Sequence, residues 1–392
     1  MDDLAARAVT AERARRRAFV ILVALGIANH TVIAGARVDV SLDALARGAS
    51  PATVGALMAL FALLPALFGI AIGRYSDRVG AMRPMIVGTL ALVASIALPA
   101  LWPGFPALFA SAVLVGFSFT LFLVPMQHVT GELGEPRKRA KRFSLIALAY
   151  SISGMLGPLI AGFGIDHAGH RATYAILALV PLVPLAVFAS ARIKPPAPVA
   201  HADPRVARGM FDLVRVPTLR RLLAINALFS LGWDLHTVFV PIYGAQLGLT
   251  ASQIGTVLAA FGFSTFLVRM AMPWMAAHAT ETQVIAAALF VSAAAYLAFP
   301  FAGGAVVLAV MSFALGLGLG AGQPMVMALL TTHAPPGRMG EIAGVRMSLL
   351  QSMAVAVPLA FGALGTGVGL VPVFWGVGAC LATGGVAARK VG

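Results

Sequence analysis

The stretch Gly73-Arg74-Tyr75-Ser76-Asp77-Arg78-Val79-Gly80-Ala81-Met82-Arg83 is a short polar connection between two long apolar runs, residues 51–72 and 84–101. Apolar runs of this length can cross a bilayer as helices, so the stretch predicts a tight hairpin between two membrane spans. Gly73 and Gly80 allow the tight turn, and Asp77 can face a helix N-terminus, where partial positive charge accumulates. Arg78 and Arg83 are expected to keep the loop on the cytoplasmic side.

The composition extends this prediction to the whole chain. Of its 392 residues, 60% are hydrophobic and only 11% are charged, whereas soluble domains carry roughly 25% charged residues. The 41 glycines suit close packing of helices in lipid. The single cysteine, Cys380, excludes an intrachain disulfide and a cysteine-based metal site. We therefore expect an all-α membrane protein.

At roughly 20 residues per span, the chain has room for about twelve transmembrane helices. The apolar runs lie near residues 18–38, 51–72, 84–101, 105–127, 143–165, 172–191, 219–243, 251–272, 283–300, 304–329, 342–363 and 367–387. Of the 28 Lys and Arg residues, all but Arg37, Arg47 and Arg171 then fall on the side of the two termini. This asymmetry predicts cytoplasmic N- and C-termini, and it explains the net charge of +14 without a nucleic-acid partner.

The spans divide into two related halves. Residues 192–218 contain several prolines and charges, and we expect a cytoplasmic linker there, with a short amphipathic helix near 208–215. It would join an N-terminal six-helix bundle, 1–191, to a C-terminal one, 219–392. Four motifs recur in the same order at offsets between 199 and 206 residues. The pairs are His30-Thr31-Val32 with His236-Thr237-Val238, 48–55 with 248–255, Pro125-Met126 with Pro324-Met325, and 142–145 with 346–349. Such a repeat is typical of transporters that bind their solute between two halves at mid-membrane.

The pattern G-x-x-x-D-R-x-G-x-x-R in residues 73–83 resembles the signature between the second and third helices of the major facilitator superfamily. The resemblance covers essentially the whole chain, and it implies two six-helix bundles that alternate access to a central cavity. It also implies a latch at the inner gate, weaker in the second half, where residues 273–278 have lost the pattern. The gate candidates are Gly73, Asp77, Arg78, Gly80, Arg83, Arg142 and Arg346. For Arg142 and Arg346, substrate contact is the alternative.

Two further stretches bear on the type of transporter. Residues 153–162 are similar to the antiporter signature of drug exporters, with Ser153 and Ala161 in place of two glycines. Small residues there also serve close helix packing, which is a sufficient reason for them. The fourth span, 105–127, contains no arginine, although proton-driven members of the superfamily typically carry one there. The resemblance therefore points toward a drug:proton antiporter. It does not say which residue supplies the positive charge that the fourth span lacks.

The seventh span carries the strongest candidate for proton coupling. Asp234 lies about 13 residues past Arg221, or roughly 20 Å along a helix, which places it near mid-bilayer. Ionisable groups at that depth are costly and usually functional, and desolvation favours the protonated form of a carboxyl. The alternative is a structural Asp234 held permanently by His236 or by a basic residue of another helix. Asn226 and Trp233 share its helix face, and all three residues are candidates for substrate binding.

The other candidate side chains for substrate binding lie on the first, eighth and tenth spans. Asn29 and His30 come at mid-depth, and His30 is also a second candidate for proton coupling, because histidine titrates near neutral pH. Arg37 can bind an anionic group or form an outer-gate ion pair with Asp39 or Asp43. Arg269 can clamp a carboxylate or extend to the cytoplasmic interface. The remaining candidate follows a glycine-rich run in the tenth span: Gln323.

The sequence predicts a secondary active transporter of a small organic solute in a bacterial inner membrane. We expect a monomer that is driven by protons, with efflux favoured over import. Import or uniport of an organic anion is the alternative. A soft metal such as copper is a further one, because methionines cluster in several spans, although methionine is also an apolar filler. A non-transporting membrane receptor on the same fold is the third alternative. No motif resembles a catalytic triad, a nucleotide loop or a zinc site, so we expect no enzyme activity, bound metal or cofactor.

Overall fold

The computed structural model describes residues 2–132, 139–182, 185–186, 190, 215–335 and 338–389. Within these ranges the regular elements are helices, and eleven of them are long and apolar enough to cross a membrane. The helices are α1 (Asp2–Ala46), α2 (Pro51–Val79), α3 (Met82–Leu101), α4 (Phe105–Glu132), α5 (Arg139–Leu179), α8 (Pro217–Gln246), α9 (Ala251–His278), α10 (Glu281–Ala298), the short 3₁₀ helix η2 (Phe299–Phe301), α11 (Ala305–Thr332), α12 (Met339–Gly367) and α13 (Leu370–Ala388). The predicted all-helical membrane fold is confirmed.

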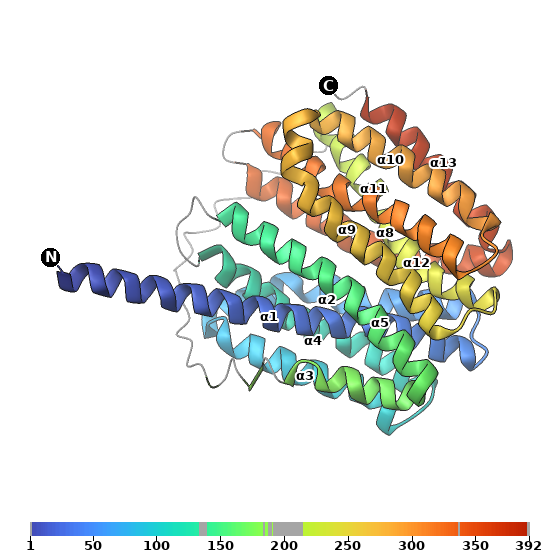
Figure 1. The fold of residues 1–392 in the computed structure, drawn as a ribbon, viewed down its shortest axis with the longest axis horizontal. Helices are drawn as coiled ribbons and strands as arrows, with labels where there is room; N and C mark the ends of the chain where they lie inside the picture. Colours follow the sequence, from blue (N-terminus) through green and yellow to red (C-terminus); the bar gives the residue numbers. More distant parts are fainter. Residues whose placement is uncertain are drawn as a thin grey trace.

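Helix α5 contains two of the predicted spans. Gly169 interrupts it with a φ of 76°, a backbone conformation that glycine adopts without a steric penalty. Beyond Gly169 the chain turns back and packs along α3 (Figure 1), where Arg171 Nε donates to the carbonyl of Ala100 at 2.7 Å. The predicted linker, 192–218, and its amphipathic helix lie outside the described residues except for positions 215–218. The two domain boundaries at this linker therefore stay predictions.

Matching turns explain the repeat between residues 48–55 and 248–255. Gly48 and Gly248 both have a positive φ, of 82° and 73°. Ser50 then caps α2 by accepting from the Thr53 amide, and Thr250 caps α9 by accepting from the Gln253 amide. A short polar side chain is preferred at this position because it satisfies an amide that has no partner within the helix. The two motifs therefore begin equivalent helices in the two halves.

The two halves lie side by side, α1–α5 in blue to green and α8–α13 in yellow to red (Figure 1). Their main contacts join α5 to α9 and α2 to α12. At the end opposite the two termini, which is the outer end, these pairs come together through glycines. Gly55 lies against the backbone of Pro358 and Gly362, and Gly162 against that of Ala251. At the inner end, Gly344 has open space beside it. The structure is therefore closed at the outer end.

Alanine substitutions at Gly55 and Gly116 are expected to show different effects, one on the conformation of the protein and the other on its stability. A Cβ at Gly55 would overlap the Pro358 carbonyl of the other half, so Gly55→Ala should favour opening of the outer end. A Cβ at Gly116 would overlap the Phe61 carbonyl of the same half, so Gly116→Ala should lower stability by about 1–3 kcal/mol. Thermal unfolding of the purified protein and labelling from outside of a cysteine in the cavity (Thr237→Cys, with Cys380→Ser) would measure both effects.

Gly376→Ala is the control for this pair, because nothing lies within 4 Å of a Cβ at Gly376. The Gly376→Ala variant should have the same unfolding temperature and the same extent of cysteine labelling as the parent. If Gly55→Ala lowered stability as much as Gly116→Ala and left labelling unchanged, the contact at Gly55 would belong to the folded core and not to a closing surface.

Candidate functional site

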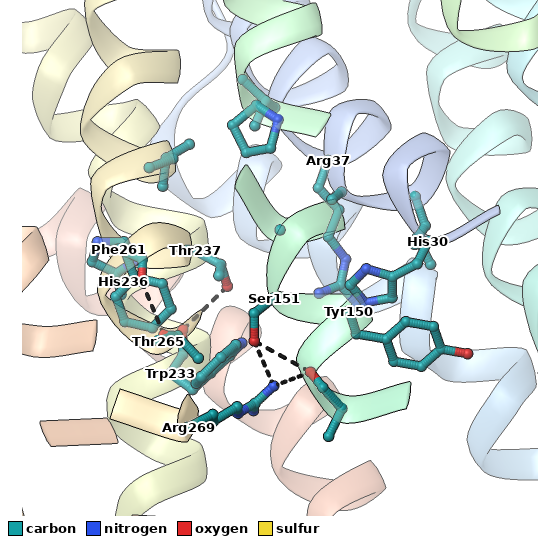
Figure 2. A pocket seen from close by; sticks show the side chains of 18 of the residues that line it. His30, Arg37, Tyr150, Ser151, Trp233, His236, Thr237, Phe261, Thr265 and Arg269 are labelled. Atoms are coloured by element: carbon teal, nitrogen blue, oxygen red, sulfur yellow. Dashed lines mark hydrogen bonds between the residues drawn. The ribbon is translucent and has the colours of Figure 1, made fainter. Parts of the chain in front are cut away.

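A cavity of about 360 Å³ lies between the two halves, near the middle of the spans. It is lined from the first half by α1, α4 and α5, and from the second half by α8 and α9 (Figure 2). Apolar and aromatic side chains form most of its wall. The polar side chains that face it are His30, Arg37, Tyr150, Ser151, Trp233, His236, Thr237, Thr265 and Arg269. An apolar pocket with a few convergent polar groups is the usual form of a binding site for a small molecule.

The first half contributes a stacked pair of rings. His30 and Tyr150 are nearly parallel, with ring centroids 4.5 Å apart. The Tyr150 hydroxyl donates to Met126 Sδ at 3.4 Å, and this hydrogen bond holds the Tyr150 ring in place. His30 Nδ1 is buried and has no hydrogen-bond partner. This nitrogen can therefore bind a solute or a proton without breaking an existing bond.

The second half contributes an aromatic corner around Phe261. Trp233 packs against its ring edge-on at 4.7 Å, and His236 stacks on it at 4.1 Å. His236 Nε2 pairs with Ser312 Oγ at 3.0 Å, so its ring is held against the wall. The corner offers flat apolar surfaces at the height of His30 and Tyr150, as Figure 2 shows.

Arg269 connects the two halves at the inner side of the cavity. Its Nη1 donates to the Ala147 carbonyl at 2.5 Å and to Ser151 Oγ at 2.8 Å, both on α5 (Figure 2). Its Nε is buried without a partner. The guanidinium therefore points across the cavity and not to the cytoplasmic interface, and it keeps one donor free for an anionic or carbonyl group.

Asp234 lies beside the cavity wall and interacts electrostatically with Arg37 of the opposite half. Its Oδ2 accepts a hydrogen bond from Ser230 Oγ at 3.2 Å. Arg37 lies 5.7 Å from the centroid of the Phe61 ring, and its Nε is buried without a hydrogen-bond partner. A carboxyl of one half and a guanidinium of the other thus interact electrostatically. The basic residue of a neighbouring helix that we considered as a partner for Asp234 is Arg37.

Four of the predicted substrate-binding residues line the cavity together: His30, Arg37, Trp233 and Arg269. Three others lie elsewhere in this conformation. Asn29 is fully buried and donates to the Leu25 carbonyl at 2.9 Å within α1. Asn226 is fully buried and accepts from Arg346 Nε at 3.0 Å. Gln323 is not among the residues that line the cavity.

The predicted gate residues lie in different parts of the structure. Asp77, Arg78 and Arg83 are exposed at the inner end, and Gly80 ends α2 with a φ of 81°. Gly73 faces Val124 of α4 at ordinary contact distance. Arg142 Nε donates to the Thr130 carbonyl at 3.0 Å inside the first half, and Arg346 contacts Asn226 inside the second. Arg338 Nε donates to Glu341 Oε2 at 2.9 Å. The gate role of these residues stays a prediction.

Several cavity residues were not predicted from the sequence, among them Tyr150, Ser151, Phe261 and Thr265. One signal could have found two of them. Phe261 and Thr265 precede Arg269 by eight and four residues, so all three lie on one helix face. For Tyr150 and Ser151 no such signal exists, because they stand among small and apolar residues next to the antiporter-like segment.

Removal of the Arg269 side chain is expected to loosen the inner contact between the halves. A hydrogen bond to a charged group contributes about 1.5–3 kcal/mol, so Arg269→Ala should raise labelling of a cavity cysteine (Thr237→Cys) from the inner side by more than about fivefold. Ser151→Ala removes one of the two acceptors and should have a smaller effect. Equal labelling in the parent and in Arg269→Ala would show that this contact does not restrict the inner opening.

Two packed helical halves around a cavity that contains charged groups inside the membrane define a secondary transporter. Residues 17–358 match the family model of the Major Facilitator Superfamily, and the chain belongs to this family of transporters, which are not enzymes. The tetracycline resistance protein, class C, of Escherichia coli is 25% identical over 78% of this chain and 78% of its own length. The multi-drug resistance efflux pump PmrA of Streptococcus pneumoniae is 23% identical over 84% and 83%. A crystal structure of the peptide transporter POT in complex with sulfate has the same fold, with a TM-score of 0.80 at 16% identity over 95% and 94% of the two chains.

Proposed function

We propose that the protein exports a small, amphipathic organic solute in exchange for protons across a bacterial inner membrane, as a monomer. One observation carries the proposal: the carboxyl of Asp234, in the second half, interacts electrostatically with Arg37 of the first half, which lines an aromatic cavity. A half-buried carboxyl beside a cavity of this kind is able to bind a proton or a polar group of the solute. The names of two relatives that match most of the chain, a tetracycline resistance protein and an efflux pump, support export.

The exchange follows from competition for one carboxylate. When Asp234 is charged, it compensates Arg37, and a hydrogen-bond donor of the solute can bind to it. When Asp234 takes up a proton, it can no longer attract that donor, and the solute is released. The rings of Trp233, Phe261 and Tyr150 would hold the apolar part of the solute in either state.

The alternative is a carrier of organic anions. Two arginines, Arg37 and Arg269, line the cavity, whereas one carboxylate, Asp234, lies close to them in the described part of the chain. Protonation of Asp234 would free Arg37 to bind an anion. In that case the proton and the anion would be bound together and would move in the same direction.

Proton movement in proteoliposomes tests both functions. Counterflow with a panel of cationic, neutral and anionic solutes would first identify a substrate. Without an imposed gradient, inward solute flux would then be followed with a pH dye inside the vesicles. An exporter by exchange should make the interior more alkaline as solute enters, and a proton–anion carrier should acidify it. Protein-free vesicles are the control, and substrate flux without proton movement would contradict coupling in either form.

A further inference from the structure

A second group of titratable side chains lies at the outer end, away from the cavity. It consists of Asp39, Asp43 and Arg47 on α1 and of His170 and Tyr174 just beyond the turn at Gly169, and we call it the outer cluster. His170 Nδ1 and Asp39 Oδ1 are 2.5 Å apart. Asp43 accepts from Arg47 Nε at 2.7 Å and from the Tyr174 hydroxyl at 3.2 Å. No member of the cluster is among the residues that line the cavity.

The two carboxylates of the cluster are buried. Asp39 is 0% exposed and Asp43 is 3% exposed, whereas the His170 side chain keeps 23% of its surface open. Asp39 Oδ2 has no hydrogen-bond partner, so one side of a fully buried carboxyl is unsatisfied. Buried charges are costly unless they are paired, so an unpaired carboxylate oxygen at this depth favours a bound proton or another ligand.

The charges of the cluster balance only when it holds one proton. Two carboxylates face one guanidinium, so a proton shared by Asp39 and His170 makes the sum zero. Within the described residues, the charged or titratable groups that interact with this pair are Asp43, Arg47 and Tyr174. The neighbouring Arg171 is directed to the Ala100 carbonyl of α3. Loss of the proton would therefore leave one uncompensated negative charge in a buried place.

The turn that carries His170 also fastens the two halves together. Asp166, four residues earlier, accepts hydrogen bonds from the Ala251 amide at 3.1 Å and the Ser252 amide at 2.8 Å, at the start of α9. These are free amides of a helix N-terminus, where a carboxylate is favourable. Gly169 lies in the chain between Asp166 and His170, and its positive φ permits the sharp change of direction there. Movement of His170 away from Asp39 would thus be transmitted over a few residues to the contact between the halves.

We propose that Asp39 and His170 form a second proton-binding site, distinct from Asp234, which opens to the outer side and stabilises the closed outer end when it is occupied. With the proton bound, the cluster is neutral and remains packed. Without it, the buried negative charge favours hydration of the pair, which displaces the turn and weakens the contact of Asp166 with α9. The physiological use of the site rests on the proton-coupled function proposed above, but its test requires no transport.

Spin labels at the outer ends of the two halves would report the opening directly. Trp102 and Phe301 are each 75% exposed, at the ends of α3 and α10–η2, so Trp102→Cys and Phe301→Cys with Cys380→Ser provide a label pair. Pulsed-EPR distances in nanodiscs would be recorded between about pH 6 and about pH 8, the range in which histidine changes its charge. Every sample would also carry Asp234→Asn, which removes the central carboxyl as a source of pH dependence.

We expect the fraction of the longer distance to rise several-fold with pH in this background. His170→Gln and, independently, Asp39→Asn should abolish the rise, because each removes one of the two groups that share the proton. His167→Gln is the matched control: it lies three residues away in the same turn and contacts only the Phe163 carbonyl and ring among described residues. It should keep the rise. A rise that persists in both His170→Gln and Asp39→Asn, or its absence in the Asp234→Asn background, would overturn the proposal. Because no solute is present, neither result depends on whether the exporter assignment is correct.

Discussion

Asp234→Asn is expected to reduce the acceleration of solute flux by a pH gradient at least tenfold, while counterflow continues. Asparagine preserves the size of the side chain and a hydrogen bond with Ser230, but it cannot bind and release a proton. Counterflow exchanges labelled for unlabelled solute and needs no net proton movement, so it should survive. Gradient-driven flux and counterflow in the same proteoliposomes would measure the two effects side by side.

Ser230→Ala is the matched control for this experiment. It removes the hydrogen bond to Asp234 Oδ2 but leaves the carboxyl in place, so the gradient response should remain. If Asp234→Asn kept the full gradient response, Asp234 would be a structural partner of Arg37. Proton coupling would then have to be sought at His30, whose free ring nitrogen faces the same cavity.

Arg37→Gln is expected to be the most damaging single substitution in the cavity. It removes the guanidinium that interacts electrostatically with Asp234, and a carboxylate inside the membrane is costly without a compensating charge. Thermal unfolding should therefore shift to a lower temperature, and counterflow should fall more than tenfold. Adding Asp234→Asn to Arg37→Gln removes the uncompensated charge and should recover most of the lost stability.

Comparison of Arg37→Gln with the double mutant shows whether Arg37 and Asp234 interact. If Arg37→Gln and the double mutant were equally unstable, the two groups would not interact, and Arg37 would act through its contact with Phe61 alone. Arg220→Gln, at an exposed position at the start of α8, is the control and should leave both stability and counterflow unchanged.

The sequence predicted the fold well because the fold depends on long patterns. Apolar runs, basic loops and the repeated turns at Gly48 and Gly248 each impose a physical requirement that recurs along the chain. Four of the predicted side chains line the cavity for a related reason. His30, Arg37, Trp233 and Arg269 are polar or bulky residues inside spans, and such residues turn toward protein or a cavity because lipid excludes them.

The same rule could not distinguish a cavity from a protein interface. Asn29 satisfies its amide within α1, and Asn226 receives Arg346, so both avoid lipid without facing the cavity. Tyr150 and Ser151 were missed because their orientation depends on how α5 rotates against α9, which no local pattern specifies. The partner of Asp234 was undetermined for the same reason, since Arg37 and Asp234 are separated by nearly 200 positions in the chain.

The outer contact between the halves has a consequence for the medium in which the protein works. Gly55 and Gly162 touch backbone, and Ala52 donates its amide to Thr366 Oγ1. Dissolved ions weaken attraction between exposed charges of opposite sign, but they have little effect on packed backbone. The closed state should therefore persist from dilute buffer to concentrated salt, so that acidity outside the cell can regulate this end of the protein independently of salinity.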